Sequence, residues 1–191
     1  MTTMKHTLTM LVQDKPGLLN RVTSMIRRRN FNIDSIAVGA SAVEGFSRMV
    51  LVVDGATTAV EQVRKQLDKI IGVVKITDIT DSDVVARELA LVKVEASPET
   101  RSEIIQLTNI FRGNMLDVTP DSIIIEVTGD EDKVNAMIEL LKGFGVIEVA
   151  RTGRVAMTRG VLGPLKKPGQ EKPKAKRIKK AASRKEEPPV S

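Results

Sequence analysis

The chain has 191 residues, of which 41% are hydrophobic and 28% are charged, a balance typical of folded globular proteins. Only 2% are aromatic and none is cysteine, which excludes disulfides, thiolate metal sites and cysteine nucleophiles and leaves few side chains on which nucleic-acid bases could stack. The formal net charge of +6 is uneven, because residues 164–191 hold ten Lys or Arg and three Glu while the rest of the chain is nearly neutral.

Residues 4–80 predict six elements of secondary structure. Alternating apolar residues are typical of strands, and apolar residues spaced by three and four are typical of helices. In chain order these patterns give a strand over 5–12, a helix over 18–29, strands over 31–41 and 46–54, a helix over 60–70 and a strand over 73–77. Pro16 is expected in the first helical turn, where a missing N–H costs nothing. The order β-α-β-β-α-β is that of a ferredoxin-like unit.

The same order repeats over residues 81–163, after a linker that begins at 80–83. The predicted elements are a strand over 89–95, a helix starting at 97–99, strands over 114–118 and 122–128, a helix from 130 and a strand over 146–150. Ser97 is the expected cap of the first helix, and Pro98 its first residue. A repeated element order is stronger evidence than any single element. We therefore predict an α+β fold of two tandem ferredoxin-like (βαββαβ) modules, at 4–80 and 81–163.

Residues 164–191 differ in composition from both modules. They contain five of the eight prolines and few large apolar residues, so they cannot bury enough surface to offset the entropy of ordering. We predict a disordered basic C-terminal tail. Two roles remain open for it: nonspecific nucleic-acid binding through its positive charge, or a solubilising or tethering extension. No aromatic interleaving or nucleic-acid motif supports a specific reader, so we favour the second role and expect no nucleic-acid partner.

Two features near the amino terminus bear on catalysis and location. The single histidine, His6, has no acidic cluster beside it in sequence, so we expect it at the surface or at a sheet edge and not in a catalytic site. Residues 1–13 lack the apolar segment of a signal peptide, and the longest apolar run, 49–53, is too short to span a bilayer. We therefore expect a soluble, cytoplasmic protein with no membrane partner.

The loop between the first predicted strand and helix carries the best local signal for a ligand site. Asp14, Pro16 and Gly17 precede a helix amino terminus, where free N–H groups and the helix dipole would hold a carboxylate. Gly17 lets the backbone approach a ligand, and the Asp14 carboxylate would meet an ammonium group. These features suit a free amino acid. They also suit an ordinary strand–helix turn, and the loop residues alone do not separate the two interpretations.

Several separated motifs resemble one known family. Asp14-x-Pro16-Gly17-Leu18-Leu19, followed by Phe31-Asn32-Ile33, resembles the amino-acid-binding ACT domain. Wider motifs resemble the small regulatory subunit of acetohydroxyacid synthase (acetolactate synthase): RRRNFNIDSIAVG at 27–39, FSRM at 46–49, ELALVKV at 88–94, FRG at 111–113, DVTP at 117–120 and EVARTG at 148–153. The resemblance covers residues 4–163 and leaves the basic tail outside.

The resemblance implies a regulatory subunit with no catalytic residues, no metal and no cofactor of its own. Such a subunit activates a separate catalytic large subunit, which carries thiamine diphosphate, Mg²⁺ and FAD, and confers feedback inhibition by valine in branched-chain amino-acid biosynthesis. The resemblance also implies a homodimer, with effector sites where modules of two chains meet. The alternative function is nonspecific nucleic-acid binding through the basic tail.

The resemblance places six effector-binding residues by matching position. Valine would be held from one chain by Asp14, Gly17, Leu18 and Leu19. From the partner chain it would be approached by Asn32 and Ile33. Several members of the family carry Asn where Asp14 stands, and an ionised Asp14 favours the ammonium group of a ligand while repelling its carboxylate. The basic run at 27–29 is interpreted as a solvated face.

Overall fold

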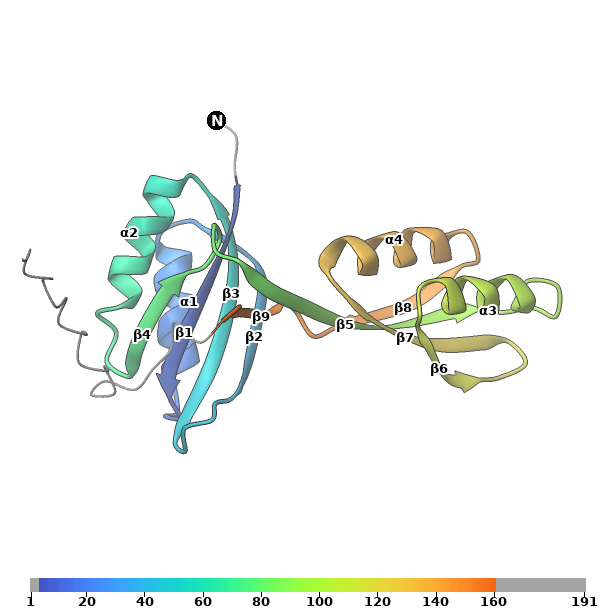
Figure 1. Ribbon diagram of the computed structural model, residues 1–191, viewed down its shortest axis with the longest axis horizontal. Coiled ribbons are helices and arrows are strands. Elements are labelled where there is room, and N and C mark those ends of the chain that lie inside the picture. Colours follow the sequence, from blue (N-terminus) through green and yellow to red (C-terminus); the bar gives the residue numbers. More distant parts are fainter. Residues whose placement is uncertain (1–3, 161–191) are drawn as a thin grey trace, which may run out of the picture.

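The structure is a computed structural model that describes residues 4–160. It contains two sheet-and-helix modules, and one long strand runs from the first into the second (Figure 1). The elements of the first module are β1 (Met4–Gln13), α1 (Leu18–Arg28), β2 (Asn32–Ala40), β3 (Phe46–Gly55), α2 (Thr57–Leu67) and β4 (Val73–Asp78). Its antiparallel strands lie in the order β2-β3-β1-β4, and both helices cover one face of the sheet. The predicted β-α-β-β-α-β unit is confirmed.

The second module repeats this arrangement. Its elements are β5 (Val84–Glu95), α3 (Arg101–Ile110), β6 (Asn114–Val118), β7 (Ser122–Gly129), α4 (Glu131–Lys142) and β8 (Val146–Arg151). The strands lie in the order β6-β7-β5-β8, which is the order of the first module when the strands are counted within each module. The prediction of a tandem repeat is therefore confirmed.

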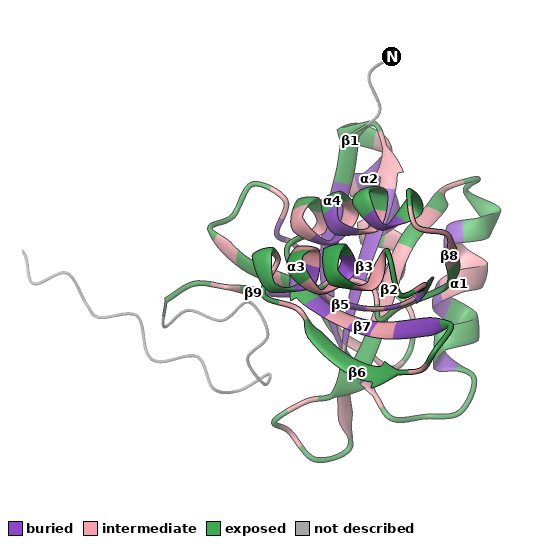
Figure 2. Cartoon of the chain, turned by 90° about the vertical axis from the view of Figure 1, so that its right-hand side faces the viewer, coloured by how far each residue is buried: buried purple, intermediate pink, exposed green. Residues whose placement is uncertain are grey.

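Each module has its own core between its helices and its sheet. β6, at the edge of the second sheet, is by contrast exposed along its whole length (Figure 2). Aliphatic side chains fill both cores, as expected of a chain with so few aromatic residues. The fully buried members include Leu8, Leu51, Val60 and Leu67 in the first core and Val92, Ile104, Ile125 and Leu141 in the second. Removing such side chains from water, at roughly 25 cal/mol per Å² of apolar surface, is the main force that holds each module together.

A two-stranded ribbon covers part of the other face of the first sheet. β5 is longer than predicted, and its first residues, Val84–Arg87, pair with β9 (Val155–Thr158). In this layer Val50, Ile79 and Ala156 form a third, smaller cluster of buried side chains. β9 was not predicted, because four residues with alternate side chains in solvent give too short a pattern to recognise. The ribbon places the start of β5 directly after the turn at 80–83, where a linker was expected.

The start of α3 differs from the prediction. The helix begins at Arg101 and not at Pro98. Ser97 and Thr100 form a turn before it, in which Ser97 N–H donates to Thr100 Oγ1 at 3.0 Å and Thr100 N–H donates to Ser97 Oγ at 3.3 Å. The local hydrogen bonds of serine and threonine compete with the helix here, so its first regular residue comes three positions later.

His6 is buried, with 2% of its surface exposed, so the prediction of a surface or edge position was wrong. Its strand β1 lies inside the sheet between β3 and β4, and His6 shares the helix-facing side of that strand with Leu8. The imidazole Nδ1 lies 3.3 Å from Asp78 Oδ2 on β4. The position of a strand within a sheet depends on its neighbours, and one segment of sequence does not reveal them.

The predicted tail, 164–191, lies outside the described residues, and so do the two roles considered for it. Over residues 4–160, no helix is long and apolar enough to cross a membrane. Within the same range, no group of three or more His, Asp or Glu side chains is arranged to hold a metal ion.

Candidate ligand-binding site

The loop after β1 leads into α1 at one end of the first sheet. Asp14 N–H donates to the Gly45 carbonyl oxygen at 3.0 Å, which fixes the loop to the β2–β3 turn. Gly17 is the N-cap of α1 and has a φ of 79°, a left-handed conformation that costs other L-residues about 1–2 kcal/mol. Pro16 had been predicted in the first helical turn. The helix begins only at Leu18, so Pro16 lies in the turn before it.

The amino end of α1 is open to an anion. Among residues 4–160 no side chain caps it, and its first turn contains no acidic residue. A Cβ built on Gly17 would meet no atom within 4 Å, so the space beside the backbone is free. A helix amino terminus presents unpaired N–H groups and about half a positive charge. The backbone at the amino end of α1, from Gly17 to Leu19, therefore suits the binding of a carboxylate group.

Asp14 is held by a hydroxyl group that the sequence analysis did not select. Ser47 Oγ, on β3, donates to Asp14 Oδ1 at 2.5 Å. The Asp14 side chain is exposed, so the carboxylate remains accessible to an ammonium group as well. Ser47 lies within the FSRM motif, but its contact with Asp14 depends on the pairing of β1 with β3 and has no local sequence signal.

The two leucines of the predicted site have different surroundings. Leu18 is 4% exposed and packs in the core of the first module, where a Cβ at Gly72 would lie 3.1 Å from Leu18 Cδ1. Leu19 is 48% exposed. Leu18 therefore anchors the loop, and of the two leucines only Leu19 presents its side chain to solvent.

Asn32 and Ile33 lie at the opposite end of the module from Asp14. Gln13, which precedes Asp14, is opposite Phe46, whereas Asn32 is opposite Asp54, eight residues further along β3. Eight residues of a strand span about 26 Å at 3.3 Å per residue, so Asn32 and the Asp14 loop are about that far apart along β3. The structure therefore does not bring the two groups of predicted residues together within one chain.

Asn32 and Ile33 line a cavity of about 400 Å³ at the carboxyl end of α1. Thr23 and Arg27 also line it, and both line an adjoining cavity of about 280 Å³ that Ile33 shares. Arg27 is exposed, in agreement with the interpretation of 27–29 as a solvated basic run, and it also lines this cavity. Its place in the cavity gives this end of the module a cation that can bind a carboxylate.

β2 is an edge strand of the first sheet. Within residues 4–160 it pairs with β3 alone, over a register that runs from Asn32 opposite Asp54 to Ala40 opposite Ser47. Its outer edge is therefore available for pairing with another strand.

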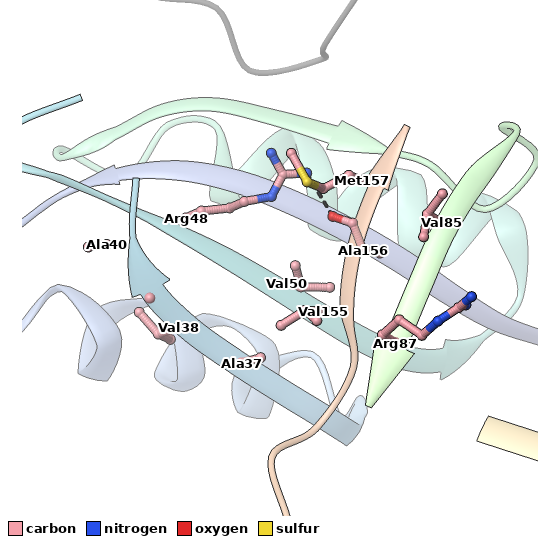
Figure 3. Close-up of a pocket in the computed structure, with 11 residues that line it drawn as sticks. Ala37, Val38, Ala40, Arg48, Val50, Val85, Arg87, Val155, Ala156 and Met157 are labelled. Atoms are coloured by element: carbon pink, nitrogen blue, oxygen red, sulfur yellow. Dashed lines mark hydrogen bonds between the residues drawn. The ribbon is translucent and has the colours of Figure 1, made fainter. Parts of the chain in front are cut away.

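An apolar cavity of about 380 Å³ lies on the face of the first sheet that the helices leave uncovered (Figure 3). Val50 and Val155 contribute to its lining, and Arg48 lies at one end. Arg48 Nη2 donates to the Ala156 carbonyl oxygen at 2.8 Å, and burial lowers the pKa of the guanidinium. The six predicted effector residues are not among those that line this cavity.

Models of two families match the two modules separately. One described as "AHAS small subunit-like ACT domain" matches residues 8–75, and one described as "Small subunit of acetolactate synthase" matches residues 87–160. The chain is 55% identical over 157 residues to a probable acetolactate synthase small subunit of Archaeoglobus fulgidus, covering 82% of this chain and 98% of that protein. It is 47% identical over 158 residues to the acetolactate synthase small subunit of Mycobacterium bovis, covering 83% and 94%.

A solved structure extends the likeness to both modules. The crystal structure of the acetolactate synthase small subunit from Thermotoga maritima aligns with a TM-score of 0.76 and 44% sequence identity. The alignment covers 83% of this chain and 99% of that one. The likeness therefore includes the tandem arrangement and is not limited to a single ACT-like unit.

Proposed function

The chain belongs to the family of acetolactate synthase small subunits, and from this premise we propose that it activates the catalytic subunit and makes it sensitive to valine. Membership of the family establishes a regulatory subunit that works with a catalytic partner in branched-chain amino-acid biosynthesis. Activation, valine as the effector and the location of its site are the parts proposed.

The open amino end of α1 is the observation that carries the proposal. It combines the backbone N–H groups of the first helical turn, of which Leu18 N–H already donates to the Lys15 carbonyl oxygen, with an accessible carboxylate, that of Asp14, within one loop. A free α-amino acid carries both complementary charges, one on its carboxylate and one on its ammonium group. The exposed side chain of Leu19 adds an apolar surface beside the loop, which suits an aliphatic effector such as valine.

A homodimer would complete the site. Two antiparallel copies of β2, related by a two-fold axis near Ile36, would place Asn32 of the partner subunit opposite Ala40. Ala40 is opposite Ser47, and Ser47 binds Asp14. Pairing along the free edge would thus bring Asn32 of the partner subunit to the end of the sheet that holds the Asp14 loop. The 26 Å separation within one chain supports a site shared between two chains.

The decisive experiment measures acetolactate formation by the cognate catalytic subunit with and without the full chain, across a valine titration. We expect the rate to rise on mixing and then to fall with valine. No activation, with both proteins folded, would overturn the regulatory proposal for this pair. Activation without any response to valine would retain the partner and overturn valine as the effector.

A matched pair of variants tests the location of the site. Asn and Asp have the same shape and both tolerate a left-handed backbone, so Gly17→Asn and Gly17→Asp differ mainly in charge. A negative charge at the amino end of α1 repels a carboxylate ligand. We expect the half-inhibitory valine concentration to rise by about tenfold or more for Gly17→Asp, and by clearly less for Gly17→Asn. Unchanged inhibition in both variants would rule out this location.

A further inference from the structure

The second module touches the strand that carries Asn32 and Ile33. After Ile33 the register between β2 and β3 shifts, so that Asp34 is an extra residue in the ladder. The next residue, Ser35, accepts a hydrogen bond through Oγ from Arg154 N–H at 2.8 Å. A bulge is a point at which a strand can change direction while the pairs on either side remain.

The backbone that leaves β8 fits closely against β2. Gly153 has a φ of 78°, and a Cβ built on it would lie 2.8 Å from Ser35 Oγ and 3.1 Å from the Ile36 carbonyl oxygen. A side chain at this position would force the two segments apart. The contact therefore depends on glycine for both its conformation and its closeness.

Charged side chains from both modules surround this contact. From the first module, Lys5 Nζ lies 2.7 Å from Asp34 Oδ2 and 2.8 Å from Glu131 Oε1, which belongs to α4 of the second module. Glu131 also pairs with the Arg154 guanidinium. Arg154 Nη1 in turn donates to Thr7 Oγ1 on β1 at 3.3 Å. The second module is thus bound both at the bulge and at the central strand of the first sheet.

Arg151, three residues before Arg154, makes side-chain hydrogen bonds only to the second module in the part of the chain that the structure describes. Its Nε and Nη2 each lie 2.7 Å from an oxygen of Glu88, and its Nη1 donates to Asn135 at 2.9 Å. The two arginines are close in sequence and alike in chemistry, but only Arg154 links the modules. Arg151 therefore serves as a matched control.

We propose that Ser35 and Arg154 are positioning residues that couple the effector site to the second module. The proposal rests on the proposed function, because it takes Asn32 and Ile33 as effector contacts. Effector binding between two chains changes the position of β2 at Asn32 and Ile33. The adjoining bulge passes that change to Arg154, and the second module shifts with it. A ligand drives such a shift only by binding one arrangement more tightly than the other.

The test separates binding of valine from the response to valine. Full-length Ser35→Ala, Arg154→Gln and Arg151→Gln are each titrated with valine by calorimetry, and each is assayed for valine inhibition with the catalytic subunit. For Ser35→Ala and Arg154→Gln we expect residual activity at saturating valine to rise several-fold, while the Kd changes by less than about fivefold. Arg151→Gln should keep the inhibition of the unaltered chain.

Gly153→Ala provides a second approach to the same contact, because it leaves every charge in place and acts by separating the two segments. Circular dichroism and thermal unfolding confirm that each variant is folded before it is assayed. Full inhibition in Ser35→Ala, Arg154→Gln and Gly153→Ala would overturn the coupling, and so would an equal loss of inhibition in Arg151→Gln. Failure of the unaltered chain to bind valine would instead overturn the proposed function, and the coupling with it.

Discussion

The two modules have the same strand order and differ in the loop that leads into their first helix. In the first module, Gly17 leaves the amino end of α1 uncapped and free of acidic residues. In the second module, Ser97 and Thr100 bond to each other before α3, and Glu103 lies in the first turn of the helix. Within residues 4–160 neither helix has a side chain that caps its amino end, so the difference lies in charge: the first turn of α1 has no acidic residue, whereas that of α3 carries Glu103. The proposed ligand binding therefore depends on the loop and not on the fold.

A further acidic residue, Glu99, lies two positions before α3, whereas Asp14 lies four positions before α1. Glu99 lies in the loop before α3, and hydrogen bonds from the Ser97 hydroxyl and from its own backbone N–H lower the pKa of its carboxyl group. A carboxylate held in its charged form beside the helix repels an anionic ligand. The second module is therefore expected to bind no amino acid at this loop.

The largest predicted effect is on the free energy of unfolding, and it comes from removing a buried side chain of the first helix in each module. Leu18→Ala and Ile104→Ala each remove a buried aliphatic side chain, and each should lower the free energy of unfolding by about 2–5 kcal/mol in urea titrations. Only Leu18→Ala should also weaken valine binding, because Leu18 anchors the ligand loop. Equal loss of valine binding in both variants would contradict the assignment of binding to the first loop.

The next effect concerns the ammonium group of the effector. Asp14→Ala removes its proposed partner, and a hydrogen bond to a charged group contributes about 1.5–3 kcal/mol, so the Kd for valine should rise by about tenfold or more. Glu99→Ala, in the equivalent loop of the second module, should leave the Kd unchanged. Calorimetric titration of the two variants makes this test. If Glu99→Ala weakens valine binding, the loops do not differ as the structure indicates.

A smaller effect is expected from the turn that closes the second loop. Ser97→Ala removes hydrogen bonds that precede α3, and by analogy with helix caps it should lower the free energy of unfolding by about 1 kcal/mol. Valine inhibition should be unaltered. Denaturant unfolding and the enzyme assay on the same preparation give both readings. A gain of valine binding in this variant would show that the turn alone keeps the second loop closed.

The smallest predicted effect is a change in stability when an ion pair between the two modules, that of Lys5 and Glu131, is removed. The hydrogen bond from Lys5, which lies in the other module, holds the pKa of Glu131 below its usual 4.5. A carboxyl group with a lowered pKa stabilises the fold above its ordinary pKa, and this contribution disappears as the pH falls through the folded pKa. Glu131→Gln should thus reduce stability at pH 6, and the difference from the unaltered chain should shrink as the pH falls below 4.5. A difference that does not change with pH would show that this charge does not link the modules. Glu139→Gln is the surface control.

The sequence predicted the repeated fold because each element carries its own pattern of apolar residues. The Asp14 loop was also recognisable, since proline and glycine before a helix mark a special backbone. Contacts between distant segments were not recognisable. Ser47 reaches Asp14 through strand pairing, and Arg154 meets Ser35 across 119 residues of chain, so neither contact leaves a local signal. The separation of Asp14 from Asn32 within one chain likewise required the strand register.

β5 has a consequence for any attempt to divide the protein. Its first residues, Val84–Arg87, lie in the ribbon that covers Val50 and Ile79 of the first module, and its remaining residues form a central strand of the second sheet. A fragment that stopped at residue 80 would keep its own core yet expose that apolar layer to water, which favours aggregation. Each module can be recognised separately in the sequence, but the solubility of the first depends on residues that follow it.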